Sequence, residues 1–493
     1  MPQFSLMVQL RAPIQRELNE LVASLDAQTN QDWELVLVVE QSRAGDWLLA
    51  SDLSDRPQVR CVLRPDGELL AWSCNALLPG LGSWVGFLNQ HDQLLPEALA
   101  EMAAAISSNP QAKVVYSDEI HRNRWGRLSF HHVKGALDGM RLQSQEYLGS
   151  LSLIRTAHLS LAGGFDPLAS DVPTHDLYLR TLEAFGPSAF INVPAPLCQH
   201  HRTYQEPKRS DVRQLPHLVR YDLHAVKQHL ARGQLPAKVV QEHGTIQVSY
   251  QHPKQPSVTA ILVLRDDLAE GIERIHAFNR TTIYQNLTVC LLHLGSAPEA
   301  EVDYQTLAKA LGYRYARHPA DSNLPALLNQ GLAAEDSDCL LLLDGRAINW
   351  GWLNQLVDHI QLPGVAAVGA RLITPRWLTA PGILGYKFEG WDWNSRGRFN
   401  RLSVPHQTGA LSPACLLVDT RKLLALGGFN ETLPTLYGMD LSLKLDSTGQ
   451  NLVQVPGAQI LTAVAVPPAI AERDSFVTTW AGWSDRFNLH LPL

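Results

Sequence analysis

One stretch of the chain places metal-binding side chain types directly after an apolar, strand-like run. The sequence SWVGFLNQHD at residues 83–92 ends in Asn89, His91 and Asp92. A carboxylate beside an imidazole can hold a transition metal such as Mn²⁺, although asparagine and histidine weaken Mg²⁺ binding relative to carboxylates. The stretch therefore predicts either a divalent-cation site or an ordinary polar strand end.

A second stretch of the same kind follows later in the chain. The sequence DCLLLLDGR at residues 338–346 ends in Asp344, Gly345 and Arg346. A cation at the place of a metal ligand disfavours metal binding, but guanidinium groups bind phosphate oxygens directly. The second stretch therefore predicts a phosphate contact or a surface arginine, and no metal site.

Both stretches belong to two copies of one unit. Each copy opens with a strand, a polar turn and a helix, at residues 4–29 and 257–282. Shared landmarks follow in the same order, namely an asparagine, a Gly-Gly-Phe triplet and an Asp-Leu helix start, which are Asn75 and Asn329, residues 163–165 and 427–429, and Asp176 and Asp440. Because apolar strands alternate with helices of about 10–15 residues, each copy is predicted to be a doubly wound α/β domain with a mostly parallel sheet.

The repeat sets the predicted domain boundaries. The first domain spans 1–206, a helical and then strand-like connector spans 207–255, and the second domain spans 256–493. A chain of 493 residues also exceeds what one hydrophobic core usually covers, so two domains are expected.

Composition excludes several classes of protein. The net charge of −7, from 41 Lys and Arg against 48 Asp and Glu, offers no basic surface for nucleic acid. The sequence has no basic leader and no apolar run of membrane-spanning length, so a cytoplasmic protein without a transmembrane segment is expected. The six cysteines form no CxxC spacing, which indicates reduced core residues.

The ordered landmarks resemble the family 2 glycosyltransferases of the GT-A fold, particularly the tandem bacterial forms of O-antigen and surface-polysaccharide assembly. The resemblance spans nearly the whole chain and therefore implies two tandem GT-A-like domains. The stretches that carry it are LDAQTNQDWELVLVVEQS (25–42), FLNQHDQLLPEAL (87–99), VYSDEI (115–120), SQEYLGSLSLIRTAHLSLAGGF (144–165) and VGARLITP (368–375).

The resemblance implies a nucleotide site, a divalent cation on the diphosphate and a carboxylate base for the acceptor hydroxyl. On the family pattern, Glu40, Asn89 and Asp92 are the candidate nucleotide-binding residues of the first domain. The candidate metal ligands are His91, Asp92 and His200. The implied cofactor is Mn²⁺ or Mg²⁺ with a nucleotide-diphosphate sugar in the N-terminal domain, and the alternative is that no cofactor binds.

The second domain departs further from the family pattern than the first. His293 stands at the strand end that corresponds to Glu40, and Thr462 at the place of His200. With Arg346 at the metal position, any nucleotide or metal binding is expected in the first domain.

The position of the base is also altered in both copies. The resemblance places it at Thr174 and at Gly438, and neither residue can accept a proton near neutral pH. His175 or Asp176 could substitute, although Asp176 and Asp440 are also expected to cap or support their helices. Residues 174 and 438 are predicted to lie in loops before a helix, where an aspartate would be tolerated.

An aromatic and basic stretch at residues 386–401 corresponds to the family's variable acceptor-side loop. Trp391 and Trp393 lie two residues apart, which in an extended segment puts both on one face, where they could stack on a sugar or anchor a partner. Burial of one tryptophan in the core is the alternative.

These losses lead to a functional hypothesis. We predict a non-catalytic relative in surface glycan or glycoprotein assembly, a scaffold or a sugar- or nucleotide-binding pseudoenzyme that associates with other glycan-assembly proteins. The alternative is an active nucleotide-sugar glycosyltransferase with an unusual N-terminal-domain site. No catalytic residue is assigned.

Overall fold

The computed structural model describes most of the chain in two compact units. The described residues are 2–10, 14–42, 52–66, 68, 70–122, 127–168, 173–201, 222–242, 245–332, 336–374, 396–397, 400–462 and 469–481. Within the described residues, the first unit runs to Val248 but leaves out Pro236–Lys238. Those three residues group with the second unit, which otherwise begins at Ser249. The described part of the predicted connector thus contributes to both units.

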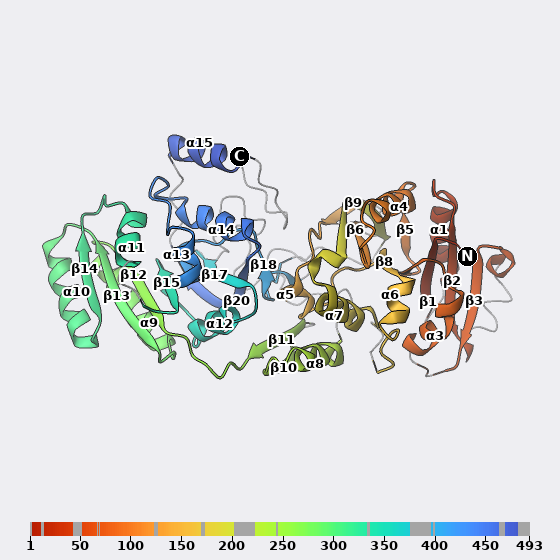
Figure 1. The fold of residues 1–493 in the computed structure, drawn as a ribbon, viewed down its shortest axis with the longest axis horizontal. Helices are drawn as coiled ribbons and strands as arrows, with labels where there is room; N and C mark the ends of the chain where they lie inside the picture. The colour runs from red at the N-terminus through yellow and green to blue at the C-terminus, as the bar shows by residue number, and fades with distance from the viewer. Residues whose placement is uncertain are drawn as a thin grey trace. The chain divides into compact units, whose positions relative to one another are not determined.

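The first unit is built on a mixed sheet (Figure 1, red to yellow). Its strand order is β3-β2-β1-β4-β8-β6-β9-β5, with β7 paired to β6. Strands β1 to β4 run parallel, as do β6 and β9, whereas β8 is antiparallel to both of its neighbours. The strands are β1 (Phe4–Leu10), β2 (Trp33–Glu40), β3 (Val59–Arg64), β4 (Trp84–Leu88), β5 (Asp92–Leu94), β6 (Val114–Arg122), β7 (Leu128–His132), β8 (Ser152–Arg155) and β9 (Phe190–His201).

Helices connect these strands. They are α1 (Gln15–Asp26), α3 (Leu70–Leu77), α4 (Ala98–Ser108), α5 (Gly139–Leu142), α6 (Thr156–Leu161), α7 (Pro173–Phe185) and α8 (Leu223–Arg232), with short 3₁₀ turns at Asp52–Asp55, Leu78–Gly80 and Pro187–Ala189. After α8 come the paired strands β10 (Ala237–Glu242) and β11 (Thr245–Tyr250). The helix and the strand predicted in the connector are therefore present as α8 and β11.

The second unit repeats the same topology (Figure 1, green to blue). Its strand order is β14-β13-β12-β15-β19-β17-β20-β16, with β18 paired to β20. The strands are β12 (Val258–Leu264), β13 (Leu287–Leu294), β14 (Arg314–His318), β15 (Cys339–Leu343), β16 (Arg346–Ala347), β17 (Val365–Ile373), β18 (His406–Gln407), β19 (Cys415–Asp419) and β20 (Asn451–Leu461). The helices are α9 (Leu268–Thr281), α10 (Pro298–Leu311), α11 (Leu324–Leu332), α12 (Trp352–Ile360), α13 (Thr420–Ala425), α14 (Tyr437–Ser447) and α15 (Ile470–Thr479).

The matching strand orders confirm the prediction of two tandem GT-A-like α/β domains with mostly parallel sheets. The central strands are continuous apolar runs because helices cover both sheet faces. All five residues of β15 are buried, and β1 buries all of its residues except Gln9. Within the described residues, no helix combines the length and the apolar character needed to cross a membrane.

The repeated asparagine and Gly-Gly-Phe landmarks are in direct contact. The Asn75 side chain in α3 accepts from the Phe165 backbone N–H and donates to its carbonyl, both at 2.8 Å. Asn329 in α11 makes the same pair of bonds with Phe429, at 2.8 and 2.9 Å. Gly164 has a φ of +80°, and a Cβ there would lie 2.4 Å from Asn75 Oδ1. Only glycine fits this close approach, which explains the repeated triplet.

We expect Asn75→Ala to lower the free energy of unfolding of the first domain by about 1–3 kcal/mol, because the Phe165 backbone groups lose both partners. Chemical denaturation of the full chain measures the change. Asn19→Ala, on the exposed face of α1, serves as the control and should be nearly neutral. Equal effects of the two variants would contradict this role for Asn75.

Candidate functional site

The carboxyl ends of the parallel strands form the edge at which open α/β sheets bind ligands. Glu40 ends β2 in the first domain, as predicted for a nucleotide-binding residue. Its Oε1 lies 2.5 Å from Nη2 of Arg64, a buried arginine at the end of the adjacent strand β3. Glu40 is therefore at the expected edge, but its carboxylate is already engaged by a guanidinium group.

The turn between β4 and β5 holds Asn89 and Asp92 together. The Asn89 backbone N–H donates to Asp92 Oδ2 at 2.7 Å, and the Asp92 N–H donates to the Asn89 carbonyl at 3.0 Å. The Asn89 amide also donates to Ser150 Oγ at 2.9 Å. Asp92 has no exposed surface. Its carboxylate thus belongs to the interior of the domain, and one of its oxygens stabilises the turn.

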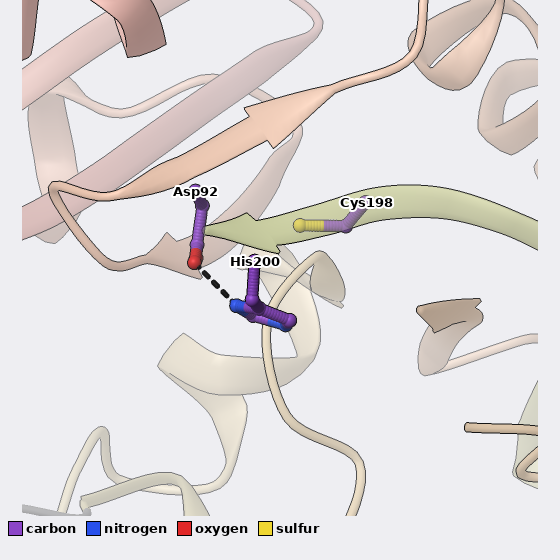
Figure 2. A group of neighbouring side chains, drawn as sticks. All are labelled: Asp92, Cys198 and His200. Atoms are coloured by element: carbon purple, nitrogen blue, oxygen red, sulfur yellow. Dashed lines mark hydrogen bonds and ion pairs between the residues drawn. The ribbon is translucent and has the colours of Figure 1, made fainter. Parts of the chain in front are cut away.

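Asp92 and His200 face each other across paired strands, as Figure 2 shows. Asp92 Oδ1 and His200 Nδ1 are 2.6 Å apart, and Cys198 lies beside them on β9. Burial alone would lower the pKa of His200, but the charges of Asp92 and Glu119 outweigh it and raise the pKa to about 10. Burial likewise opposes ionisation of Asp92, whereas His200 lowers its pKa to about 2. The two residues therefore form a buried ion pair.

A second carboxylate, that of Glu119 in β6, lies close to nitrogen atoms of four side chains. Its Oε1 lies 3.1 Å from His121 Nε2 and 3.0 Å from His132 Nδ1. Its Oε2 lies 3.0 Å from Lys134 Nζ and 3.2 Å from His200 Nε2. Burial opposes the charge of Glu119, but Lys134 and His200 hold its pKa well below its usual range. His200 thus bridges Asp92 and Glu119.

The two other histidines of this cluster have lowered pKa values. Burial is the main cause for both His121 and His132, and it outweighs the attraction of Glu119. Both are therefore neutral near neutral pH and donate one N–H each to the ionised carboxylate. The His121 and His200 rings stack with their centroids 4.6 Å apart.

Glu119 lies in the VYSDEI stretch at residues 115–120, and the sequence alone predicted no role for it. One signal was available, because Glu119 and His121 lie two residues apart and share a face of a strand. His91, a predicted metal ligand, is half-buried in the turn before Asp92 and helps to lower the Asp92 pKa. Among the described residues, the groups with metal-ligand atoms within 4.8 Å of one another are Asp92, Cys198 and His200, and Glu119, His121 and His200. Neither group includes His91.

The neighbours of the first base position have structural roles. His175 is fully buried, with Nε2 2.6 Å from the Leu142 carbonyl and Nδ1 accepting the Asp222 backbone N–H at 2.9 Å. Asp176 Oδ2 accepts from Arg180 Nε at 2.6 Å, and Oδ1 lies 3.6 Å from Arg232 in α8. Neither side chain is available to an acceptor hydroxyl. Both residues instead help to attach α8 to the first domain.

The second domain attaches a helix at the same place. Asp440 in α14 accepts from Trp480 Nε1, just after α15, at 3.1 Å, and it pairs with Lys444 at 2.7 Å. Helices α8 and α15 each follow the long last strand of their copy, β9 or β20. The Asp-Leu landmark therefore marks where the closing helix of each repeat docks.

The prediction that residues 174 and 438 lie in loops is wrong. Thr174 and Gly438 are in the first turns of α7 and α14, and both are buried. A Cβ on Gly438 would lie 2.6 Å from Pro413 Cδ. An aspartate at 438 would therefore collide with Pro413, contrary to the predicted tolerance.

In the second domain, the end of β13 corresponds to the end of β2 that carries Glu40. The side chains of the domain itself fill the space there. His293, the next-to-last residue of β13, has no exposed surface, and its Nε2 lies 3.0 Å from Asp266 Oδ1 and its Nδ1 3.0 Å from the Tyr315 hydroxyl. Asp266 also accepts from the backbone N–H groups of Ser296 and Ala297, at 3.0 and 3.1 Å.

In the second domain, ion pairs also close the carboxyl end of β15. Asp344 accepts two bonds from Arg265, at 2.8 and 2.7 Å, and one from Arg274 at 2.8 Å. Arg346 Nη1 lies 3.5 Å from Glu273, and the Thr462 hydroxyl donates to the Asp344 carbonyl at 3.1 Å. Trp391 and Trp393, the predicted acceptor or partner loop, lie outside the described residues.

Comparison with known families finds a match within the first domain. Residues 14–159 match the family model described as Glycosyl transferase family 2. The matched segment contains Glu40, Asp92 and Glu119, and the match agrees with the resemblance found in the sequence.

Two curated relatives match most or all of the chain. An uncharacterized protein of Sinorhizobium fredii is 26% identical over 482 residues, which cover 93% of this chain and 53% of that protein. The O-antigen biosynthesis protein RfbC of Myxococcus xanthus is also 26% identical and covers 100% of this chain and 40% of its own length. The chain thus spans about half the length of the curated relatives it matches, or less.

Solved glycosyltransferase structures align with about half of the chain. GalNAc-T7 with UDP, GalNAc and Mn²⁺ aligns with a TM-score of 0.39 at 12% identity, covering 47% of this chain and 49% of that one. A Pyrobaculum calidifontis mannosyltransferase with GDP-Man and Mn²⁺ aligns with a TM-score of 0.35 at 14% identity, covering 47% and 66%.

The Asp92–His200 pair predicts a pH dependence of stability. Folding raises the His200 pKa from 6.5 to about 10, so its contribution is complete below pH 6.5 and is lost as the pH rises towards 10. The unfolding free energy of the full chain, measured in urea across this range, should fall more steeply than that of His200→Gln. His131→Gln, a partly exposed histidine of the same domain, is the control. Identical slopes for wild type and His200→Gln would refute the ion pair.

Gly438→Ala should destabilise the second domain by about 1–3 kcal/mol, because the added methyl group overlaps the Pro413 ring. Thermal unfolding of the full chain measures the loss. Gly331→Ala in α11 is the matched control, since nothing lies within 4 Å of its Cβ, and alanine there should be neutral or slightly stabilising. A Gly438→Ala protein as stable as wild type would show that α14 can shift.

Proposed function

We propose that the chain is a family 2 glycosyltransferase-like protein of surface glycan or glycoprotein assembly in which neither domain transfers sugar. Its role is that of a scaffold or a sugar- or nucleotide-binding subunit beside active transferases. The match to an O-antigen biosynthesis protein over the whole chain supports the assembly role. The proposal also includes a nucleotide sugar or glycan as ligand, other glycan-assembly proteins as partners and a cytoplasmic location.

The observation that carries the non-catalytic role is the state of the base position. Thr174 and Gly438 have no carboxylate, and the adjacent His175 and Asp176 are buried and bonded to structural partners. Asp440 is bonded to Trp480 and Lys444. Loss of a general base typically lowers the rate by about 10²–10⁴-fold.

Ligand binding is proposed for the first domain only. Glu40 ends β2 and can exchange its Arg64 contact for a nucleotide hydroxyl group, with Asn89 in the nearby turn that the buried Asp92 supports. In the second domain His293 fills the corresponding position, and a Cβ on Gly295 beside it would already lie 2.4 Å from His293 Nε2. This asymmetry favours a single nucleotide or sugar site.

The alternative is an active transferase with a rebuilt site in the first domain. The observation that favours it is the survival of the Glu40 and Asp92 carboxylates within the segment that matches the family 2 model. This alternative requires a base other than His175 or Asp176, since both are enclosed.

A transfer assay and a binding assay on the full chain separate these functions. We expect no transfer of label from UDP-, GDP- or dTDP-sugars to host glycan acceptors, with or without Mn²⁺. Calorimetry should show that Glu40→Gln weakens binding of the matching nucleoside diphosphate roughly tenfold, the size of one lost hydrogen bond to a charged group. His293→Gln, the equivalent change in the second domain, should leave that affinity unchanged. Robust transfer by the purified protein would establish the active-enzyme alternative.

A further inference from the structure

Both domains place positively charged side chains against the carboxylates at the strand ends where the family resemblance implies a divalent cation. We infer that the chain carries its own cations in place of that metal, so that folding and ligand binding do not depend on Mn²⁺ or Mg²⁺. The inference deepens the proposed function, on which it rests for the statement that a ligand binds in the first domain.

In the first domain the donor set does not fit a metal ion. A histidine ligates a metal through a nitrogen lone pair, with the other nitrogen bonded to a supporting group. Both nitrogens of His200 face carboxylate oxygens, Nδ1 at 2.6 Å from Asp92 and Nε2 at 3.2 Å from Glu119. The Nδ1 contact is a hydrogen bond, whereas the Nε2 contact has the distance of an ion pair without hydrogen-bond geometry. Both place a negative oxygen beside the ring, where an imidazolium carries its positive charge.

Lys134 occupies the remaining side of Glu119. Its ammonium group has no exposed surface and lies 3.0 Å from Glu119 Oε2, and it also donates to the Leu148 carbonyl. A Cβ on Gly149 would lie 2.8 Å from the same Glu119 oxygen and 3.4 Å from Lys134 Nζ. The backbone therefore closes over the pair, and a metal ion at Glu119 would have to displace the lysine.

The charges of this network are balanced without a metal. Asp92 and Glu119 contribute two negative charges, and His200 and Lys134 contribute two positive charges. The side chains of all four residues are at most 8% exposed. A divalent cation added to a balanced, buried network leaves excess positive charge where water cannot solvate it, which is strongly unfavourable.

The second domain reaches the same result with different residues. Asp344 directly follows β15, and Arg265 binds its carboxylate with both terminal nitrogens. Arg274 adds a third bond from α9, with its side chain 13% exposed. A metal ion would have to separate Asp344 from two guanidinium groups, one of them in bidentate geometry, which is a strong arrangement for a carboxylate.

The direct test titrates Mn²⁺ into the purified full chain and measures the EPR signal of the Mn²⁺ that remains free in solution. We expect no stoichiometric loss of that signal up to about 1 mM, a range that covers weak oxygen-ligand sites. EDTA should not change the melting temperature, and nucleoside diphosphate affinity should be equal with Mn²⁺ and with EDTA. Binding of one Mn²⁺ per chain that His200→Gln abolishes would overturn the inference.

A second test seeks a gain of binding. Lys134→Gln removes one cation from Glu119 while keeping a hydrogen-bonding group, and it should raise Mn²⁺ affinity by roughly tenfold or more. Lys113→Gln, in the same domain but outside the network, is the matched control and should bind no more than wild type. A folded Lys134→Gln protein with unchanged Mn²⁺ affinity would contradict the role given to Lys134. If that variant fails to fold, the wild-type titration decides.

The outcomes separate this inference from the proposed function. Tight Mn²⁺ binding without sugar transfer refutes the inference that the chain's own cationic side chains replace the metal ion. It leaves the non-catalytic role intact. Sugar transfer in the presence of EDTA refutes the non-catalytic role and supports that inference.

Discussion

The first domain depends on one buried carboxylate, Glu119, which accepts contacts from four nitrogen atoms. Their side chains come from β6, β7, β9 and the segment just after β7, so this single group joins three strands at the edge of the sheet. Its Oε1 is hydrogen-bonded to His121 and His132, whereas its Oε2 lies within ion-pair distance of Lys134 and His200 without hydrogen-bond geometry. Removing it would leave Lys134 and His200 buried with fewer counter-charges, which typically costs about 3–5 kcal/mol.

The two copies preserve the same architecture with different residues at the strand ends. In the first copy Glu119 and Asp92 are buried inside the domain beside Lys134 and His200. In the second copy the segment beside the base position is apolar, with Ala410, Leu411 and Pro413 packed near α14. The strand order, the Asn to Gly-Gly-Phe clamp and the docked terminal helix are the same in both. Packing and backbone constraints have thus been kept where groups specific to chemistry have changed.

Much of this fold could be predicted from the sequence because its signals are local. Apolar strands between helices, and the ordered landmarks, were sufficient for two α/β domains. The pairing of Asp92 with His200 was also within reach, since both were candidate ligands, but its nature as an ion pair was not. The contact between Glu119 and Lys134 could not be predicted, because it depends on the register between β6, β7 and β9. No local sequence pattern specifies that register. The helical positions of Thr174 and Gly438 depend similarly on the packing of α7 and α14.

The docking of α8 changes where the first domain ends as a folding unit. Glu183 in α7 binds His229 and Arg232 of α8, and the Asp222 backbone binds His175. The stretch that looks like a linker in the sequence therefore supplies the closing helix of the first repeat. A fragment cut at residue 206 would leave Glu183 and the buried His175 without these partners. Limited proteolysis or shuffling of the two halves would therefore preserve the first domain only with the break beyond Val248.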